Sequence, residues 1–264
     1  MERGVITLIT DFGTKDSYTG VLKGVILGIN PMVRLVDITH EISPQDIFEA
    51  GFILNNSYKF FPEGTIHLVV VDPGVGSKRK AILMKAGDYL FIGPDNGAFS
   101  FIYESERIDK IVELINNKYF LPFISNTFQG RDIFAPAAAY LSRGTPLEDF
   151  GESCNEVVKF DIPKPEIKKG EINGVVLHVD RFGNLISNIP EVLFRKLVGK
   201  GKHEVSIGGK ALGNIKVSYS EVKEEEEAVA LFGSTGYLEV SVRDQDARER
   251  PNLNKGNIIK VVHK

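Results

Sequence analysis

The sequence is poor in the features that mark several classes of protein. Its 264 residues include one cysteine, Cys154, which excludes an internal disulfide framework and an all-cysteine metal site. Lys and Arg number 32 against 35 Asp and Glu, giving a net charge of −3, so composition offers no reason to expect nucleic acid. No apolar run approaches the roughly 20 residues that span a bilayer, and the N-terminus lacks a signal-peptide pattern. We therefore expect a cytoplasmic protein with neither nucleic acid nor membrane as a partner.

The rest of the composition is that of a globular protein, with 42% hydrophobic and 25% charged residues. In the first half, short apolar runs such as VITLIT (5–10) and IHLVVV (66–71) alternate with helical patterns at 17–29, 45–60 and 131–142. This alternation predicts an α/β domain over 1–160, with a largely parallel sheet flanked by helices. The apolar runs at 81–84 and 89–92 could form a hairpin within it. Ser43 and Pro44 are the expected cap and first residue of the second helix.

The second half changes character after a polar segment with two prolines at 161–170, which is the expected linker. Short strand-like runs follow it, separated by glycines and polar residues, and only 192–198 looks helical. Residues 171–264 are therefore predicted to form a smaller all-β, barrel-like domain.

Two polar turns follow apolar runs in the first half, where ligands bind in open α/β sheets. The first carries Asp11 and Asp16, two carboxylates suited to hydroxyl or amine recognition, although either could simply cap the next helix. The second carries Asp72 and Arg79, which could pair around a polar substrate or water, or form only a surface ion pair on a tight turn. The second turn fits neither the P-loop nor the dinucleotide-binding spacing.

Three further segments have local structural explanations. Arg131 and Asp132 could only decorate the start of a helix. Taken alone, the stretch from Asp180 to Asn184 is typical of a β-turn. Residues 233–236 could form another turn, and they do not fit the nucleophile-elbow pattern. No histidine has metal-ligand spacing, and His67 is expected to be structural. An Mg²⁺ site of carboxylates alone is not demanded by any spacing.

Taken together and in order, these segments resemble one family, the S-adenosyl-L-methionine (SAM) hydroxide adenosyltransferases. These are SAM hydrolases that form adenosine, related to the SAM-dependent fluorinases and chlorinases. The resemblance covers most of the chain and is carried by ITLITDFGTKDSYTG, HLVVVDPGVGSKR, IGPDNG, TFQGRDIFAP and VDRFGNLISNI.

The resemblance implies a homotrimer whose active sites lie between the N-terminal domain of one subunit and the C-terminal domain of its neighbour. The implied reaction is attack of water or hydroxide on the ribose C5′ of SAM. Methionine then leaves as a neutral thioether. A sulfonium is already an activated leaving group, so we expect neither a metal nor any cofactor beyond the substrate, and the protein's task is to position and desolvate the nucleophile.

The resemblance also implies roles for single residues. Asp11 is similar to the carboxylate that holds the ribose hydroxyls, Asp16 to a second acidic residue of that pocket, and Phe128 to a ribose-pocket wall. In the second half, Asp180 matches the carboxylate that pairs with the methionine amino group, and Phe182 is similar to an adenine-stacking ring. Asn184 is similar to a side chain that hydrogen-bonds adenine, and Ser234 matches a residue near the methionine carboxylate.

The catalytic positions implied by the resemblance are Asp72, Arg79 and Gln129. Halogenating relatives replace the Asp, so Asp72 favours water over halide. The family pattern at the third position is TFHGRD, whereas this chain has Gln129. An amide can orient water but cannot take a proton at neutral pH. If the usual histidine handles a proton, the reaction is slowed here.

Three alternatives stay open at this stage. A SAM- or adenosine-binding protein with little or no turnover would bind its ligand without releasing methionine. A metal-dependent hydrolase using Asp11, Asp16 and Asp72 would be inactivated by EDTA. Halogenation of SAM would require chloride.

Overall fold

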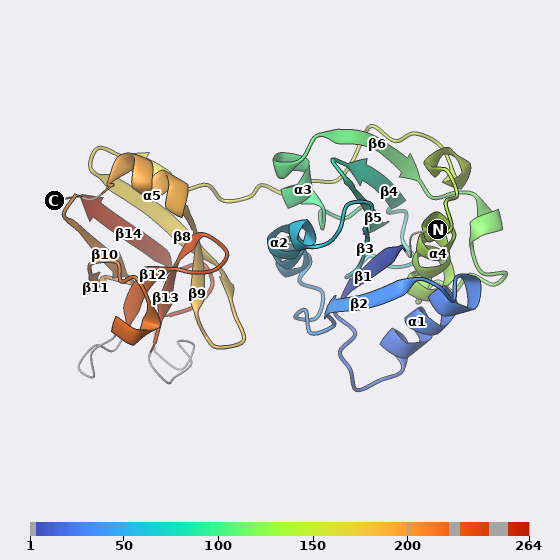
Figure 1. The fold of residues 1–264 in the computed structure, drawn as a ribbon, viewed down its shortest axis with the longest axis horizontal. Coiled ribbons are helices and arrows are strands. Elements are labelled where there is room, and N and C mark those ends of the chain that lie inside the picture. The colour runs from blue at the N-terminus through green and yellow to red at the C-terminus, as the bar shows by residue number, and fades with distance from the viewer. Residues whose placement is uncertain (1–3, 200, 222–227, 243–252, 264) are drawn as a thin grey trace. The chain divides into compact units, whose positions relative to one another are not determined.

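The computed structural model describes residues 4–199, 201–221, 228–242 and 253–263. The chain divides into two compact units, Met1–Asp161 and Ile162–Lys264, and each is described by itself (Figure 1).

The first unit is a six-stranded sheet with helices on both faces (Figure 1). Its strands are β1 (Val5–Thr10), β2 (Arg34–Thr39), β3 (Ile66–Val70), β4 (Ala81–Ala86), β5 (Tyr89–Pro94) and β6 (Ile108–Glu113). Its α-helices are α1 (Tyr18–Ile29), α2 (Ile47–Ser57), α3 (Ser100–Ser105) and α4 (Ala135–Ser142). Shorter turns of helix are η1 (Tyr58–Phe60), η2 (Asn117–Tyr119) and η4 (Leu147–Phe150), which are 3₁₀, and η3 (Gly130–Phe134), which is a π-helix.

The predicted α/β layer with flanking helices is confirmed, but the sheet is mixed. The strand order is β2-β1-β3-β5-β4-β6. The pairs β1–β2, β1–β3 and β3–β5 are parallel, while β4 runs antiparallel to both β5 and β6. The expectation of a largely parallel sheet therefore holds for four of the strands only. Only two residues, Gly87 and Asp88, separate β4 from β5, and so short a connection can join only antiparallel strands.

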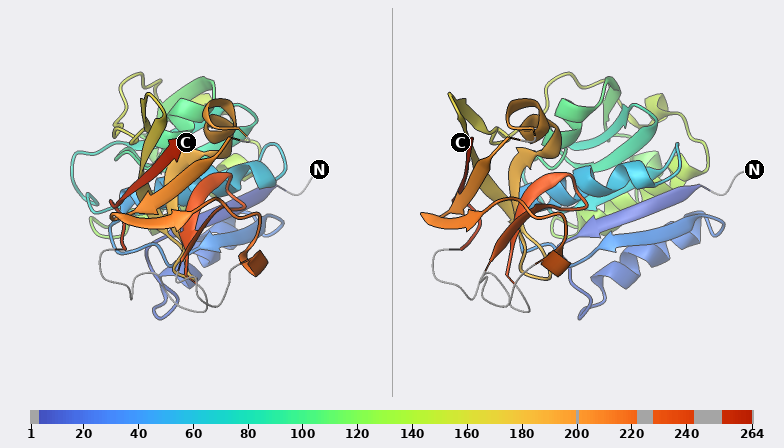
Figure 2. Two further views of the ribbon diagram at one scale, coloured as in Figure 1. Left: turned by 90° about the vertical axis from the view of Figure 1, so that its left-hand side faces the viewer. Right: turned by 60° about the vertical axis from the view of Figure 1, so that its left-hand side comes forward.

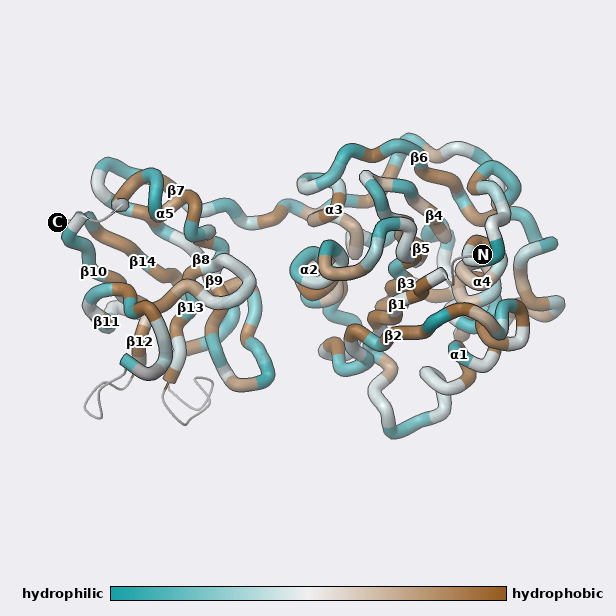
Figure 3. The backbone as a smooth tube through the Cα atoms, in the orientation of Figure 1, coloured by the Kyte–Doolittle hydropathy of each residue, from teal (hydrophilic) through white to brown (hydrophobic). Residues whose placement is uncertain are grey.

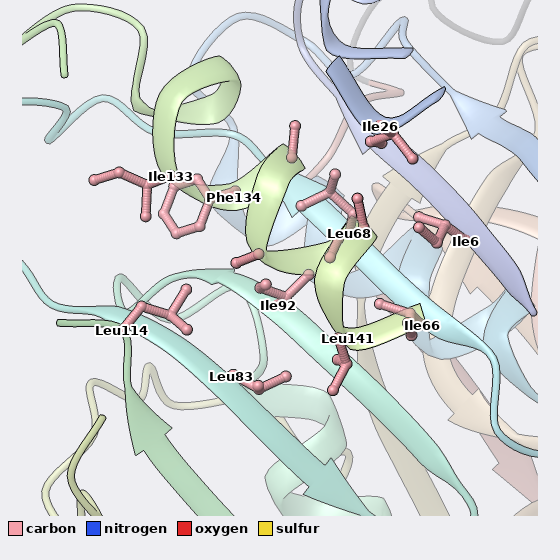
Figure 4. Close-up of a cluster of buried hydrophobic side chains, with 14 of the residues drawn as sticks. Ile6, Ile26, Ile66, Leu68, Leu83, Ile92, Leu114, Ile133, Phe134 and Leu141 are labelled. Carbon is pink, nitrogen blue, oxygen red and sulfur yellow. The ribbon is translucent and has the colours of Figure 1, made fainter. Parts of the chain in front are cut away.

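Both faces of this sheet are buried, which explains the uninterrupted apolar runs. All five residues of β3 are buried, as is typical of a strand covered on both sides, and the central strands are mostly brown in Figure 3. One face packs against α1 and α4, through a cluster that Figure 4 shows, including Ile6, Leu68, Ile92 and Phe134. The other face packs against α2 and α3, through residues such as Ile9, Val69 and Phe99.

The second helix does not begin where the sequence predicted. Its N-cap is Asp46, whose side chain accepts a hydrogen bond from the Glu49 amide, and not Ser43. Gln45 has a φ of 67°, so the chain cannot continue as a right-handed helix from Pro44. The pattern of a cap followed by proline is thus part of a loop that leads into α2.

The second unit is a curled antiparallel sheet, seen from other sides in Figure 2. Its strand order is β11-β10-β14-β8-β9-β13-β12, with β7 paired to β8. An isolated bridge between Lys216 and Leu231 links the segment after β11 to β12. The path of the sheet is therefore nearly closed around a core that includes Val176, Leu185 and Val261, as the barrel-like prediction required.

The strands of this unit are β7 (Glu166–Lys168), β8 (Glu171–Val179), β9 (Leu185–Pro190), β10 (His203–Ile207), β11 (Lys210–Gly213), β12 (Val229–Phe232), β13 (Tyr237–Ser241) and β14 (Ile258–His263). Its helices are α5 (Glu191–Leu197) and the 3₁₀ turn η5 (Tyr219–Glu221). Part of the segment predicted as a linker, 161–170, is thus a strand. Gly170, with a φ of 78°, allows the tight turn that folds β7 back onto β8.

None of the described helices is both long enough and apolar enough to cross a membrane. His67, predicted to be structural, is fully buried on β3, where its Nδ1 lies 2.7 Å from the Thr7 hydroxyl.

Candidate functional site

A buried polar network lies where β3 ends. Arg79 Nε lies 3.0 and 3.1 Å from the two carboxylate oxygens of Asp72, and Nη2 donates to Asp72 Oδ2 at 2.5 Å. The same Nη2 donates to Oε1 of Gln129. The side chains of Arg79 and Asp72 are only 10% and 6% exposed. The alternative of a surface ion pair is therefore wrong, and the three residues singled out for catalysis are in contact.

The turn that carries Asp72 is shaped by its glycines and by a neighbouring loop. Gly76 has a φ of 78°, and a Cβ there would lie 2.4 Å from the carbonyl oxygen of Asn126. Only glycine permits that backbone conformation and that approach without strain. The chain then returns to the start of β4 with Arg79 over the ring of Phe134, 5.3 Å from its centroid.

Gln129 enters the network from the segment just before η3. Single-turn π-helices are often found at functional sites. Gly130, the first residue of η3, packs against the end of β3, since a Cβ there would lie 3.0 Å from Cγ1 of Val70. This close approach brings Gln129 beside the residues that follow Val70.

The network joins one cation, one anion and one neutral amide, so its formal charge is zero. It presents carboxylate and amide oxygens that accept hydrogen bonds, together with amide and guanidinium donors. Such a group can bind and orient a small polar molecule. Among its three members, Asp72 is the one whose side chain is a base, because neither a guanidinium nor an amide offers a basic lone pair.

Asp11 follows β1, which is the parallel neighbour of β3, with Thr10 opposite Val70. Its Oδ2 accepts a hydrogen bond of 2.9 Å from the backbone N–H of Gln45. Asp16 lies exposed on the same loop. Neither carboxylate caps α1, because the N-cap is Ser17 and no side chain caps that helix. The structural explanation offered for these two residues is therefore wrong.

Aromatic rings pack between the Asp11 loop and the Gln129 segment. Phe128 makes edge contacts with Phe12 and Tyr18, at centroid distances of 5.7 and 5.2 Å. Arg131 lies 5.1 Å from the Phe128 centroid on its own helical turn. Phe12 and Tyr18 were not singled out from the sequence. The sequence feature that could have identified them is their position beside Asp11 and Asp16, in a turn predicted to bind a ligand.

Arg131 and Asp132 do more than decorate a helix start. Asp132 is fully buried. It accepts hydrogen bonds from Arg131 Nε at 2.6 Å and from the backbone N–H of Ser125 at 2.7 Å. The pair therefore anchors the loop before Phe128 and Gln129.

In the second unit, Asp180 and Asn184 organise the hairpin between β8 and β9. Asp180 Oδ1 accepts from the amides of Phe182 and Asn184, and its Oδ2 accepts from the Asn184 side chain at 2.9 Å. Gly183 supplies the positive φ, 83°. Phe182 is held at the tip with 79% of its surface exposed. The loop thus presents an aromatic face beside the paired side chains of Asn184 and Asp180.

Ser234 is exposed in the turn between β12 and β13. The register pairs Tyr237 with Pro190 and Val240 with Leu185. This turn and the Asp180 hairpin therefore lie toward opposite ends of β13. Between them is Glu239, whose carboxylate is buried and accepts a hydrogen bond from the Tyr219 hydroxyl. Burial raises the pKa of Glu239, and the charge of Asp180 raises it further.

The structure thus assembles two sets of predicted residues, one on each unit. Asp11, Asp72, Arg79, Phe128 and Gln129 lie on converging loops of the first unit, and Asp180, Phe182 and Asn184 share one hairpin of the second. No group of three or more His, Cys, Asp or Glu in the described ranges is placed to hold a metal ion.

Known proteins are similar to this chain over both units. The model of the SAM hydroxide adenosyltransferase N-terminal domain matches residues 6–151, and that of the C-terminal domain matches 174–260. A Methanocaldococcus jannaschii protein named (R)-S-adenosyl-L-methionine hydrolase is 36% identical, covering 98% of this chain and 96% of that protein. A fluorinase from Nocardia brasiliensis is 26% identical, over 98% of this chain and 97% of its own length.

Two solved structures are similar throughout. An uncharacterized conserved protein from Thermotoga maritima has a TM-score of 0.91 and 37% identity, covering 98% of this chain and all of that one. A conserved hypothetical protein from Thermus thermophilus has a TM-score of 0.78 and 34% identity, with the same coverage.

Proposed function

Because the chain belongs to the SAM hydroxide adenosyltransferase family, we propose that it hydrolyses SAM to adenosine and L-methionine. The observation that carries this proposal is the buried network of Asp72, Arg79 and Gln129 at the end of β3. Its donors and acceptors suit a small polar molecule such as water, and it lies beside β1, the strand that ends just before Asp11.

The proposed step is an in-line displacement. The oxygen of the bound water forms a bond to C5′ of the ribose, and the bond from C5′ to sulfur breaks with its electron pair remaining on sulfur. Methionine leaves as a neutral thioether, and the water oxygen, after losing one proton, becomes the 5′-hydroxyl of adenosine. Asp72 is the proposed first acceptor of that proton. Positioning and desolvation of the water carry the rate enhancement, with no metal or cofactor.

The first unit is proposed to bind the ribose. Asp11 would accept hydrogen bonds from the 2′ and 3′ hydroxyls, since a carboxylate has two oxygens that suit a vicinal diol. Its bond from the Gln45 amide holds one oxygen in place. Phe128 would form a wall of the pocket together with Phe12 and Tyr18, and Asp16 would add negative charge near the sulfonium.

The second unit is proposed to bind the rest of the substrate. Phe182 would stack on adenine and Asn184 would hydrogen-bond its edge, while Asp180 pairs with the methionine amino group and Ser234 lies near its carboxylate. We further propose that the two sets of residues meet in a homotrimer, each site drawing on two subunits. A cytoplasmic location and the absence of nucleic-acid or membrane partners remain predictions from the sequence.

Gln129 is proposed to make this hydrolase slow. It accepts a hydrogen bond from Arg79, so it can orient water through the network, but it cannot take the proton that a histidine could. If this loss of a proton acceptor stops the reaction, the protein would bind SAM or adenosine with little or no turnover, which is the second candidate function.

The deciding experiment is a chromatographic assay of the purified protein with SAM in chloride-free buffer containing EDTA. Release of adenosine and methionine in equal amounts supports metal-independent hydrolysis. Binding of SAM without product would support the second candidate. Activity that EDTA abolishes, or a chloride-dependent 5′-halo-adenosine, would overturn the proposal in favour of a metal-dependent hydrolase or a halogenating enzyme.

A further inference from the structure

The Asp11 loop is joined to the loop after β2 by a buried contact between Thr10 and His40. Both residues are buried, at 0% and 5% exposure, and the Thr10 hydroxyl lies 2.8 Å from Nδ1 of His40. Neither residue belongs to the network of Asp72, Arg79 and Gln129.

Asp37 bears on which partner donates the hydrogen in the bond between Thr10 and His40. Its Oδ1 lies 3.1 Å from Nε2 of His40, a contact without hydrogen-bond geometry, and its Oδ2 accepts from Lys23 on α1 at 2.5 Å. Burial alone would raise the pKa of Asp37, but the contacts with Lys23 and His40 outweigh it and lower that pKa. A neutral His40 ring would carry its hydrogen on Nε2, because the carboxylate faces that atom.

The consequence for Thr10 follows from the tautomer. Nδ1 of His40 is then an acceptor, so the Thr10 hydroxyl donates to it. The lone pairs of Thr10 Oγ1 are then free of His40, and Oγ1 accepts a hydrogen bond of 3.2 Å from the backbone N–H of Phe12. The amide that follows Asp11 is thereby fixed by the Thr10 hydroxyl.

Backbone bonds complete the connection between the two loops. Gly13 N–H donates to the carbonyl of His40 at 2.7 Å, and Ile42 N–H donates to that of Thr10 at 3.3 Å. On the same loop, the positive φ of Gln45 accompanies its N–H donation to the Asp11 carboxylate. A residue other than glycine keeps such a conformation only where its surroundings hold it.

We propose that His40 is a positioning residue, which acts through the Thr10 hydroxyl to hold the Asp11 carboxylate in its binding orientation. The inference rests on the proposed function only for what Asp11 binds, the ribose diol. A diol contact of that kind is made equally in the ground state and the transition state. Loosening it therefore raises KM and leaves kcat nearly unchanged.

The chain offers a matched control for this inference. Thr7, on the same strand, makes the same kind of contact with His67, at 2.7 Å, and both residues are fully buried. This pair lies under the aromatic rings of Tyr58 and Phe91, away from the Asp11 loop. Thr10→Val and Thr7→Val therefore remove the same hydroxyl from equally buried sites, and only one of them adjoins the Asp11 loop.

The test combines hydrogen exchange with kinetics on the full chain. In Thr10→Val we expect at least about tenfold faster exchange at the amides of Phe12 and Gly13, and a KM for SAM about three- to tenfold higher with kcat within about twofold, the size expected for one hydrogen bond. His40→Asn, whose Oδ1 can replace Nδ1 as acceptor, should restore much of the protection and of the KM relative to His40→Ala. Thr7→Val should leave all three quantities at their wild-type values.

Unchanged exchange in Thr10→Val, or equal changes in Thr7→Val, would overturn the inference. This holds whether or not the protein acts on SAM, since exchange needs no substrate. A fall in kcat with KM unchanged would also overturn it. A wild-type protein inert toward SAM would instead count against the proposed function, and the exchange data would still decide the role of His40.

Discussion

At the scale of single residues, the site combines a rigid charged pair with one neutral amide side chain, Gln129. Asp72 and Arg79 share several charge-assisted hydrogen bonds in a mostly buried position, so their geometry is well defined. Gln129 joins this pair through its hydrogen bond with Arg79. Activity should therefore depend on which side chain stands at position 129.

Gln129→His is expected to raise kcat for SAM hydrolysis roughly tenfold or more, toward the 10²–10⁴-fold range of general-base catalysis, because an imidazole can accept a proton. KM should change less than about twofold. Initial rates of adenosine formation measure both, with Gln129→Asn as a control that keeps the amide. An unchanged kcat in the histidine variant would show that this position has no part in proton transfer.

His67 should make stability fall in acid. Burial lowers the pKa of His67 from 6.5 to about 3. Between these values the unfolded chain binds a proton that the folded protein does not, so each unit of pH below 6.5 costs on the order of 1.4 kcal/mol. His67→Asn should flatten the dependence of the unfolding free energy on pH between about 6.5 and 4, measured by urea denaturation. The exposed His263→Asn is the control, and equal slopes in all three proteins would contradict the assignment.

Residue types predicted much of the first-unit site, and contacts supplied the rest. Asp72 and Arg79 were recognisable because they flank a turn after a strongly apolar strand. Phe12, Tyr18 and His40 were not, since a ring or an imidazole beside a turn is more often a core residue. Only the packing of Phe12 on Phe128 and the contact of His40 with Thr10 set them apart.

At the scale of elements, the site depends on how closely η3 approaches β3. Gly130 leaves no room for a side chain, because a Cβ would meet Val70 at 3.0 Å and Leu22 at 3.5 Å. On α1, by contrast, Gly24 is exposed and nothing lies within 4 Å of the same position. The same substitution should therefore have opposite effects in the two helical segments.

Gly130→Ala is expected to lower the free energy of unfolding by about 1–3 kcal/mol through overpacking, and to reduce kcat by displacing Gln129. Gly24→Ala should raise stability by about 0.5–1 kcal/mol, because alanine favours helix more than glycine does. Thermal denaturation and the SAM assay compare both with the wild type. Equal stability changes in the two variants would show that the contact at Gly130 is relieved at little cost.

Periodicity predicted the elements well, and it failed where a turn controlled the chain. The apolar runs at 81–84 and 89–92 predicted the β4–β5 hairpin, but the antiparallel pairing of β4 with β6 was not predicted. The short strand β7 lies within a segment whose prolines suggested a linker, and its pairing depends on the positive φ of Gly170. The start of α2 was misplaced because the conformation of Gln45 cannot be read from its type.

At the scale of the whole molecule, the two predicted sets of residues belong to different compact units. Asp72 and Gln129 lie on the first, and Asp180 and Asn184 on the second. The sequence alone could not establish how such sets combine, because no pattern within one chain reports a contact between copies of it. The proposed homotrimer therefore calls for a test that depends on assembly.

Mixing two impaired variants supplies that test. Asp72→Asn should abolish activity through the first unit, and Asn184→Ala should weaken it through the second. If each site draws on two subunits, unfolding and refolding an equimolar mixture should recover part of the wild-type rate. Simple mixing of the folded variants is the control. No recovery, with trimers confirmed by light scattering, would place each site within a single subunit.

The charge balance of the Asp72 and Arg79 pair bears on which nucleophiles the pocket would admit. An isolated guanidinium would attract any small anion, but here a carboxylate already occupies it from 2.5 Å. A halide arriving at the same place would have to shed its hydration shell and then meet a negative charge that it cannot displace. Water carries no net charge and both donates and accepts hydrogen bonds, so it would enter without that penalty. The side chain at position 72 would then act as an electrostatic filter on the solvent, by which chloride at physiological concentrations is kept from competing.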